Sequence, residues 1–168
     1  MKNLLLCAVL ICLLPLCSEA QIVAGSQEDK AFQQITAETN TDAKLQKLTD
    51  FEKSFPSSRV LPSVYLMVID LYRERNDPDK IIEYGEKVLK IDDGNVTALM
   101  VVSRNYAMKR MNLDRAVELA QRAVDRIVKM RAGPAPGSYT EAQWKSYLDN
   151  TEGAARSILT YTQTVRGK

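Results

Sequence analysis

The residue types that most often carry catalysis or bind transition metals are almost absent from this chain. It has no histidine, and its three cysteines, Cys7, Cys12 and Cys17, all precede residue 20. Cys–His and Ser–His catalysis, zinc sites built from these ligands and a histidine pH switch are therefore excluded. No glycine-rich phosphate loop and no nucleophile motif is present. The sequence predicts a protein that is not an enzyme and that holds no cofactor and no metal.

Carboxylates are numerous, and one acidic cluster, at residues 92–95, looks like part of a calcium loop. It lacks the alternating ligands and the closing glutamate of such a loop. The pattern favours an acidic turn after a helix, in which Gly94 takes a positive φ. Other carboxylates stand near lysine at helical spacing, as Glu83 and Lys87 do, and are expected to form solvated pairs.

The charge balance argues against a nucleic-acid ligand. The chain has 23 lysines and arginines against 21 aspartates and glutamates, a net charge of +2. Readers of nucleic acid carry a basic face or stripe, which so even a balance does not predict. The 168 residues suit one domain, and a chain of this size buries enough surface to fold without disulfides or metals.

The first 20 residues have the layout of a secretory signal peptide. Lys2 gives a positive start, residues 4–16 form an apolar run, and Ser18 and Ala20 place small residues before the bond to Gln21. The apolar run is shorter than the roughly 20 residues that span a bilayer, so no membrane span is expected after cleavage. None of the cysteines follows a small residue, which argues against a lipid anchor. We therefore expect an exported protein, periplasmic or extracellular, without cysteine in its mature form.

The elements that must position any site are helices. Apolar residues recur three or four apart, between breaks rich in proline, glycine, asparagine and aspartate, and no stretch alternates with period two. The expected helices cover residues 27–38, 42–55, 62–75, 79–91, 96–110, 113–131 and 141–166, with Thr140 as the cap of the last.

An internal period of 34 residues is the strongest signal in the sequence. Tyr65, Val68, Ile69 and Tyr72 recur 34 residues later as Leu99, Val102, Ser103 and Tyr106. With two helices per unit, this period is typical of tetratricopeptide repeats, and the chain resembles that family. The second helices also follow its pattern, as Ile81-x3-Gly85 and as Ala116-x3-Ala120-x2-Ala123.

The chain departs from the family pattern in three ways. Ile69 and Ile81 replace small residues where helices cross, so the helices there are expected to sit further apart. Tyr106 and Ala116 are ten residues apart, where Tyr72 and Ile81 are nine apart, which predicts one extra residue in the turn near Asn112. The match is close over residues 62–124 and weaker before residue 60 and after residue 140.

The resemblance implies an all-α, right-handed α-solenoid of antiparallel helix pairs over residues 21–168. Its units would cover residues 28–61, 62–95 and 96–131, followed by a terminal helix at 140–166. Each pair has an apolar face that it can bury only against its neighbours. Families of helical pairs with longer periods remain an alternative.

In the tetratricopeptide family, the first helices line a concave face that holds partner peptides. Carried over by register, that face would comprise Leu66, Asp70, Arg73, Met100, Arg104, Met108, Tyr161 and Thr164. Methionine suits such a surface because its thioether is flexible and polarizable. Leu66 and Met100 could equally be plain core. Family members that clamp a C-terminal carboxylate carry Lys and Asn where this chain has Leu66, Asp70, Met100 and Arg104, so this chain is not expected to recognise one.

The resemblance therefore implies a non-catalytic scaffold that binds a partner peptide or protein on its concave face. Glu86 and Gln121, on the second helices, are expected to face outward on the convex side. Two alternatives stay open: a structural subunit of a cell-envelope assembly, and an accessory domain of an enzyme on another chain. The sequence leaves open the partner and the oligomeric state.

Overall fold

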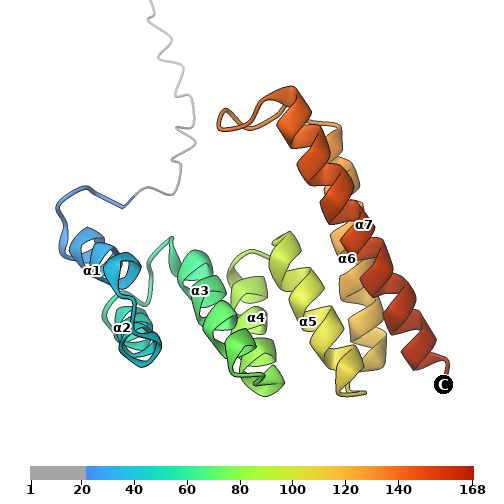
Figure 1. The fold of residues 1–168 in the computed structure, drawn as a ribbon, viewed down its shortest axis with the longest axis horizontal. Helices are drawn as coiled ribbons and strands as arrows, with labels where there is room; N and C mark the ends of the chain where they lie inside the picture. Colours follow the sequence, from blue (N-terminus) through green and yellow to red (C-terminus); the bar gives the residue numbers. More distant parts are fainter. Residues whose placement is uncertain (1–21) are drawn as a thin grey trace, which may run out of the picture.

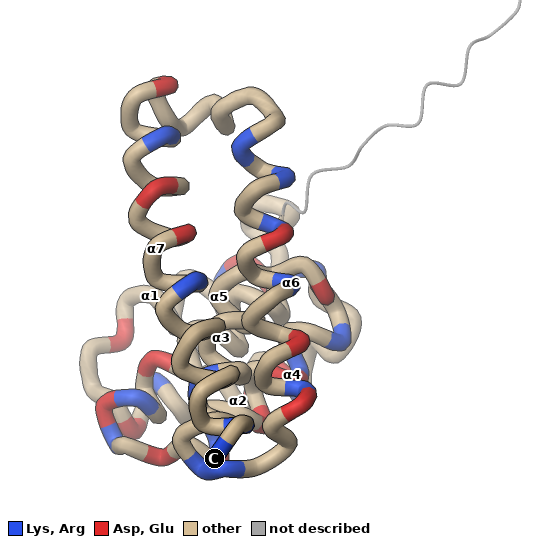
Figure 2. The backbone as a smooth tube through the Cα atoms, turned by 90° about the vertical axis from the view of Figure 1, so that its right-hand side faces the viewer, with Lys and Arg blue, Asp and Glu red and all other residues tan. Residues whose placement is uncertain are grey.

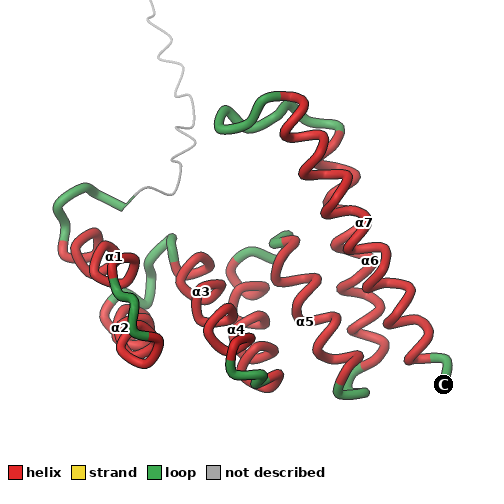
Figure 3. The backbone as a smooth tube through the Cα atoms, in the orientation of Figure 1, coloured by secondary structure: helices red, strands yellow, loops and turns green. Residues whose placement is uncertain are grey.

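The structure, a computed structural model, describes residues 22–168. The predicted signal peptide and its cleavage site lie outside the described residues. Over the described range the chain is all-helical and has no strand (Figure 1, Figure 3). The helices are α1 (Gln27–Ala37), α2 (Thr41–Ser54), α3 (Leu61–Glu74), α4 (Pro78–Ile91), α5 (Val96–Met108), α6 (Leu113–Arg131) and α7 (Glu141–Arg166). The predicted helices are confirmed, each end to within two residues.

Helices that follow one another in sequence pack side by side. Each helix from α1 to α6 contacts the next, and α7 contacts both α6 and α5 (Figure 1). Buried apolar side chains from all seven helices join into one elongated core. Among the described residues, no helix is long and apolar enough to cross a membrane. The all-α class is thus confirmed, with the sequential packing that a stack of helical pairs requires.

Side-chain caps fix where most of the helices begin. The carboxylate of Asp77 accepts from the backbone N–H of Lys80 at 3.1 Å, which starts α4. The side chain of Thr140 accepts from the N–H of Gln143, whose own side chain accepts from the N–H of Thr140. This capping box satisfies two donors that a helix start leaves open, and it confirms the predicted cap of α7.

The turns after α3 and α5 repeat the same backbone geometry 34 residues apart. The carbonyl of Tyr72 accepts from Asp77 at 3.0 Å, and that of Tyr106 accepts from Met111 at 2.9 Å. Each turn contains a left-handed residue with φ of 53°, Asn76 in the first and Arg110 in the second. The second turn has four residues and the first has three, which confirms the predicted insertion. The added residue, Asn112, is also left-handed.

The expected positive φ at Gly94 is wrong. Within residues 22–168, Gly25 is the one glycine with a positive φ. The carboxylate of Asp92 accepts from the N–H of Gly94 at 3.2 Å, and the Asn95 side chain caps α5. The turn is therefore closed by side chains and needs no left-handed residue.

Helices α3, α4 and α5 meet at Gly85. A Cβ placed on Gly85 would lie 2.3 Å from Cγ2 of Val102 and 4.0 Å from Cδ1 of Ile69. The missing side chain lets the backbone of α4 approach α5 closely, and it leaves room for the bulk of Ile69. Ile69 and Ile81, which replace small residues of the repeat pattern, are both buried.

Ion pairs between neighbouring helices also recur along the stack. A cation at the end of α3, α5 and α7 pairs with the aspartate that is the second residue of the helix before it. The pairs are Arg75–Asp42, Lys109–Asp79 and Arg166–Asp114, the last at 3.4 Å. These pairs are exposed and add little stability. Their recurrence places α3, α5 and α7 in equivalent positions, and likewise α2, α4 and α6.

Candidate partner-binding groove

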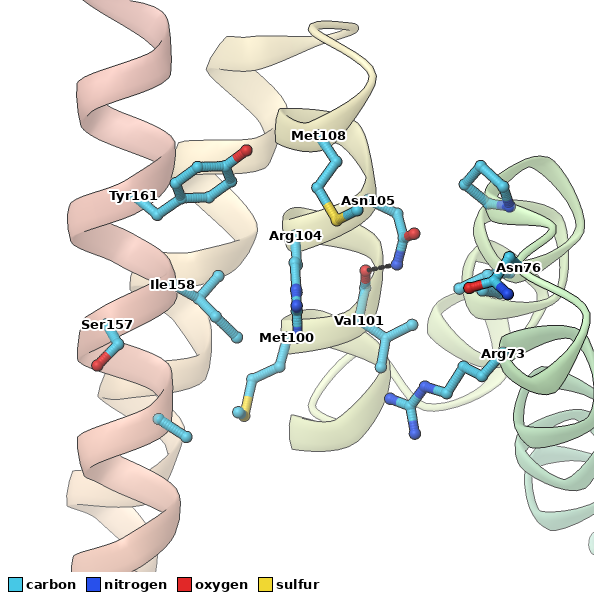
Figure 4. A pocket seen from close by; sticks show the side chains of 13 residues that line it. Arg73, Asn76, Met100, Val101, Arg104, Asn105, Met108, Ser157, Ile158 and Tyr161 are labelled. Carbon is cyan, nitrogen blue, oxygen red and sulfur yellow. Dashed lines mark hydrogen bonds between the residues drawn. The ribbon is translucent and has the colours of Figure 1, made fainter.

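A cavity of about 740 Å³ opens between α5, α7 and the turn that joins α3 to α4 (Figure 4). We call it the groove. Its lining comes from α3, α5 and α7, from that turn and from the start of α4: Arg73, Asn76, Pro78, Ile81, Met100, Val101, Arg104, Asn105, Met108, Ala154, Ser157, Ile158 and Tyr161. Because α5 lies between α3 and α7, its exposed face forms the centre of the groove.

The groove is largely apolar, and part of that apolar surface is open to solvent. Ile81 and Val101 are buried, while Met108 is 55% exposed and Tyr161 is 43% exposed. Figure 4 shows the Tyr161 ring pointing from α7 across the groove towards α5. Large exposed apolar side chains that gather in a concavity are typical of a contact surface.

The charged residues of the groove are arginines. Arg73 donates to the carboxylate of Asp70 at 2.9 Å, and both side chains are exposed. The side chain of Arg104 is exposed and has no hydrogen bond or ion pair in the part of the chain that the structure describes. None of the lining residues is Asp or Glu. The groove therefore presents positive charge beside apolar surface.

The structure brings five of the eight predicted site residues into the groove. They are Arg73, Met100, Arg104, Met108 and Tyr161. Asp70 is outside the lining and reaches it through its pair with Arg73. Leu66 packs against the core and does not line the groove, whereas Met100 does both. The hydroxyl of Thr164 donates to the carbonyl of Thr160 at 2.8 Å, outside the groove.

Sequence reasoning missed eight of the lining residues. Three of them, Ala154, Ser157 and Ile158, lie seven, four and three residues before Tyr161, so helical spacing could have found them. Val101 and Asn105 directly follow predicted residues on α5, and the remaining three are Asn76, Pro78 and Ile81. Nothing in the sequence shows that the α3–α4 turn faces α7, because that depends on the path of the stack.

The expectation that Glu86 faces outward is wrong. Its carboxylate is partly buried and accepts from Arg115 at 2.8 and 2.9 Å and from the hydroxyl of Tyr106 at 3.1 Å. The hydrogen bond from the Arg115 guanidinium lowers the pKa of Glu86, against the effect of partial burial. Glu86 thus joins α4 to α5 and α6. Gln121 is exposed, as expected.

A second glutamate, Glu52, lies 34 residues earlier and likewise joins its helix, α2, to the next two helices, α3 and α4. It accepts from the hydroxyl of Tyr65 at 3.0 Å and from Nζ of Lys87 at 2.9 Å. Burial, together with the bond to Glu52, raises the pKa of Tyr65 to about 12. Lys87 also lies 4.3 Å from the ring centroid of Tyr84. The predicted pair with Glu83 is present, at 3.7 Å, but Lys87 is partly buried and bonds Glu52 as well.

A second, smaller pocket, of about 250 Å³, differs from the groove in charge. Its lining includes both signs, with Asp93 and Asp125 beside Arg122, Arg126 and Lys129. Arg122 and Asp93 already pair there at 3.2 Å. Over residues 22–168, no cluster of three histidines, cysteines, aspartates or glutamates could hold a metal ion.

Comparison with known proteins assigns the chain to no family. A scan against protein-family models found no match, and a search of curated proteins also found none. The function therefore has to be argued from the groove and from the repeated packing of the helices.

Proposed function

We propose that this chain is a non-catalytic scaffold that binds a partner polypeptide in the groove. The observation that carries the proposal is the open concavity of about 740 Å³ on the exposed face of α5. Met108 and Tyr161 expose apolar surface there, and Arg104 keeps its donors unused. A pocket lined by apolar side chains with a few polar groups is the usual form of a binding site.

The proposal includes a tetratricopeptide-like, right-handed solenoid. Three observations support repeated units. The turns after Tyr72 and Tyr106 share their geometry, the cation–aspartate pairs recur at three helix ends, and Glu52 and Glu86 act alike 34 residues apart. In such a stack the first helices of the units share the inner face, which is where α3, α5 and α7 meet the groove.

The second helices, α2, α4 and α6, offer fewer unpaired charged groups for binding. The carboxylates of Glu52 and Glu86 are occupied by partners on the following helices. Arg122 is held by Asp93 and Glu118. These contacts tie units together, so the groove is the better candidate for binding another molecule.

One observation favours a structural subunit as the second candidate. Helices α6 and α7 extend as a hairpin beyond the other helices (Figure 2). Tyr139 and Tyr147 are exposed near its end, where Trp144 stacks on Tyr147 with ring centroids 5.3 Å apart. This apolar tip could anchor the chain permanently in an assembly. Obligate co-purification with another subunit through the tip, and not through the groove, would favour this candidate.

The site of action proposed for the protein is the periplasm or the extracellular space. The proposal rests on the predicted cleavage before Gln21. We expect the intact mass of exported protein to match a chain that begins at Gln21. A mature mass that includes Cys17 would contradict both the cleavage site and a thiol-free mature protein.

Site-specific photocrosslinking tests the proposed binding face. A photoreactive residue placed at Met108 or Tyr161 should crosslink a partner in the producing cells, because both side chains are exposed in the groove. The matched control is the same residue at Gln121, which is exposed on a second helix. Crosslinks from position 121 with none from positions 108 and 161 would show that the convex face binds the partner.

A further inference from the structure

The charge of the groove is one-sided, although the chain as a whole is balanced. The sequence carries 23 basic and 21 acidic residues, and the smaller pocket near Asp93 contains both signs. Among the residues that line the groove, the charged ones are Arg73 and Arg104 alone. The groove is thus set apart by charge as well as by shape.

Arg104 occupies the centre of this surface. It lies four residues after Met100 and four before Met108 on α5, so the three side chains share one helix face. Figure 4 shows them as a row along α5, between α7 on one side and Arg73 on the other. With no partner among the described residues, the guanidinium keeps its five N–H donors available.

Arg73 is the second cation that a ligand could reach. Its pair with Asp70, at 2.9 Å, joins two exposed side chains on successive turns of α3. Exposed pairs of this kind stabilise a protein by about 0–1 kcal/mol. An incoming carboxylate can therefore take over Arg73 at little cost.

We infer that the groove takes an acidic peptide segment, in which an Asp or Glu side chain is flanked by apolar residues. The inference rests on the proposed function and names its ligand. The peptide carboxylate binds Arg104, and its apolar neighbours pack against Met100, Met108 and Tyr161. Arginine matches a carboxylate with two parallel hydrogen bonds, which are among the stronger polar contacts in proteins.

The alternative peptide compositions fit this surface poorly. A basic segment would bring like charge against Arg104 and Arg73. A purely apolar segment would cover the Arg104 guanidinium without a partner, and burying an unpaired charge is costly. Both penalties oppose the wrong ligand, which is how specificity usually arises.

Selection from a displayed library of random dodecapeptides tests the inference on the exported protein. The peptides are fused through their C-termini, so side chains are their sole source of carboxylates. We expect the enriched peptides to combine Asp or Glu with apolar residues and to be depleted of Lys and Arg. Changing the shared acid of the best peptide to its amide should weaken binding about ten-fold or more.

Two variants identify the residue that binds the carboxylate of the peptide. Arg104→Gln should lose most of the preference for the acidic peptide over its amide form, because the cation that binds the peptide carboxylate is gone and Arg73 remains paired with Asp70. Arg122→Gln, which removes an arginine from a second helix, should retain the full preference. If Arg104→Gln keeps the preference for acid, or if enriched peptides contain no acid, the inference is wrong while the groove still binds peptides.

A third variant distinguishes failure of the acidic-peptide inference from failure of the proposed function. Met108→Lys combined with Tyr161→Lys changes two exposed groove residues, and its circular dichroism should match that of the unchanged protein. Peptide binding in the groove is itself refuted if the unchanged protein enriches no peptides, or if this variant enriches the same peptides as the unchanged protein.

Discussion

Two glutamates, Glu52 and Glu86, link successive helices at the residue scale. Each is partly buried on a second helix, and each carboxylate accepts hydrogen bonds from one tyrosine hydroxyl and from one cationic side chain. The sequence could not reveal the role of Glu86, because its partner Arg115 lies 29 residues away on another helix. Helical periodicity places a residue on a face, but it does not show which neighbouring helix covers that face.

Replacing Glu86 by glutamine should lower the free energy of unfolding by about 1–2 kcal/mol at pH 7, because charge-assisted hydrogen bonds are lost. The pKa of Glu86 is lowered in the folded state. Its contribution is therefore present above the unfolded-state pKa and is lost as pH falls through the folded one. Urea unfolding at several pH values should show the difference from the unchanged protein shrinking as pH drops below the ordinary glutamate pKa of about 4.3.

The matched control is Glu83→Gln on the same helix, whose surface pairs with Lys80 and Lys87 should contribute about 0–0.5 kcal/mol each. If Glu83→Gln destabilises as much as Glu86→Gln, the buried link is not what stabilises the stack. The same conclusion would follow if the difference in free energy of unfolding between Glu86→Gln and the unchanged protein stayed constant down to acidic pH.

Gly85→Ala should destabilise the protein by about 1–3 kcal/mol, because overpacking outweighs the roughly 1 kcal/mol that alanine gains in a helix. The added Cβ would lie 2.3 Å from Val102. Thermal and urea unfolding of Gly85→Ala, Val102→Ala and the double variant measure the coupling. The double variant should cost less than the two single changes together.

Gly153 provides the comparison within the same fold. It lies in α7, and a Cβ there would meet nothing within 4 Å. Gly153→Ala should therefore stabilise the protein by up to about 1 kcal/mol. Equal effects of the two alanines would contradict the close approach of α4 and α5.

At the scale of elements, the sequence predicted the helices and the length of one turn, for physical reasons. Apolar spacing and strong breakers delimit all seven helices, and the nine- and ten-residue spacings predict the longer turn before α6. Register alone brought Met100, Arg104 and Met108 onto one face. It could not predict that Asn76 and Pro78 border the groove, since this depends on how successive pairs are rotated. Nor could it predict that Asp92 closes its own turn.

Stability should vary along the stack, as expected where each unit contacts mainly its neighbours. Helix α1 lies at one end and has a single fully buried residue, Ile35, whereas α5 packs on α4, α6 and α7. In native-state hydrogen exchange, the amides of α1 should open at a free energy at least about 2 kcal/mol lower than those of α5. Equal protection of α1 and α5 would mean that the chain opens as one unit.

At the scale of the whole molecule, the protein is expected to hold together by packing alone. All three cysteines precede residue 20 and the chain has no histidine. The melting temperature of the chain from Gln21 onward should therefore be the same with a thiol reductant, with a chelator and with neither. A fall of several degrees in either reagent would reveal a disulfide or a structural metal.

Methyl NMR of methionine tests the central proposal, partner binding in the groove, most directly. After residue 21 the chain has five methionines, Met67, Met100, Met108, Met111 and Met130, and of these Met100 and Met108 line the groove. On titration with the crosslinked partner or with the selected acidic peptide, the methyl signals of Met100 and Met108 should shift with a common dissociation constant. Those of Met67, Met111 and Met130 should stay in place. Saturable shifts at Met111 or Met130, with Met100 and Met108 unmoved, would place the partner elsewhere and contradict the proposal.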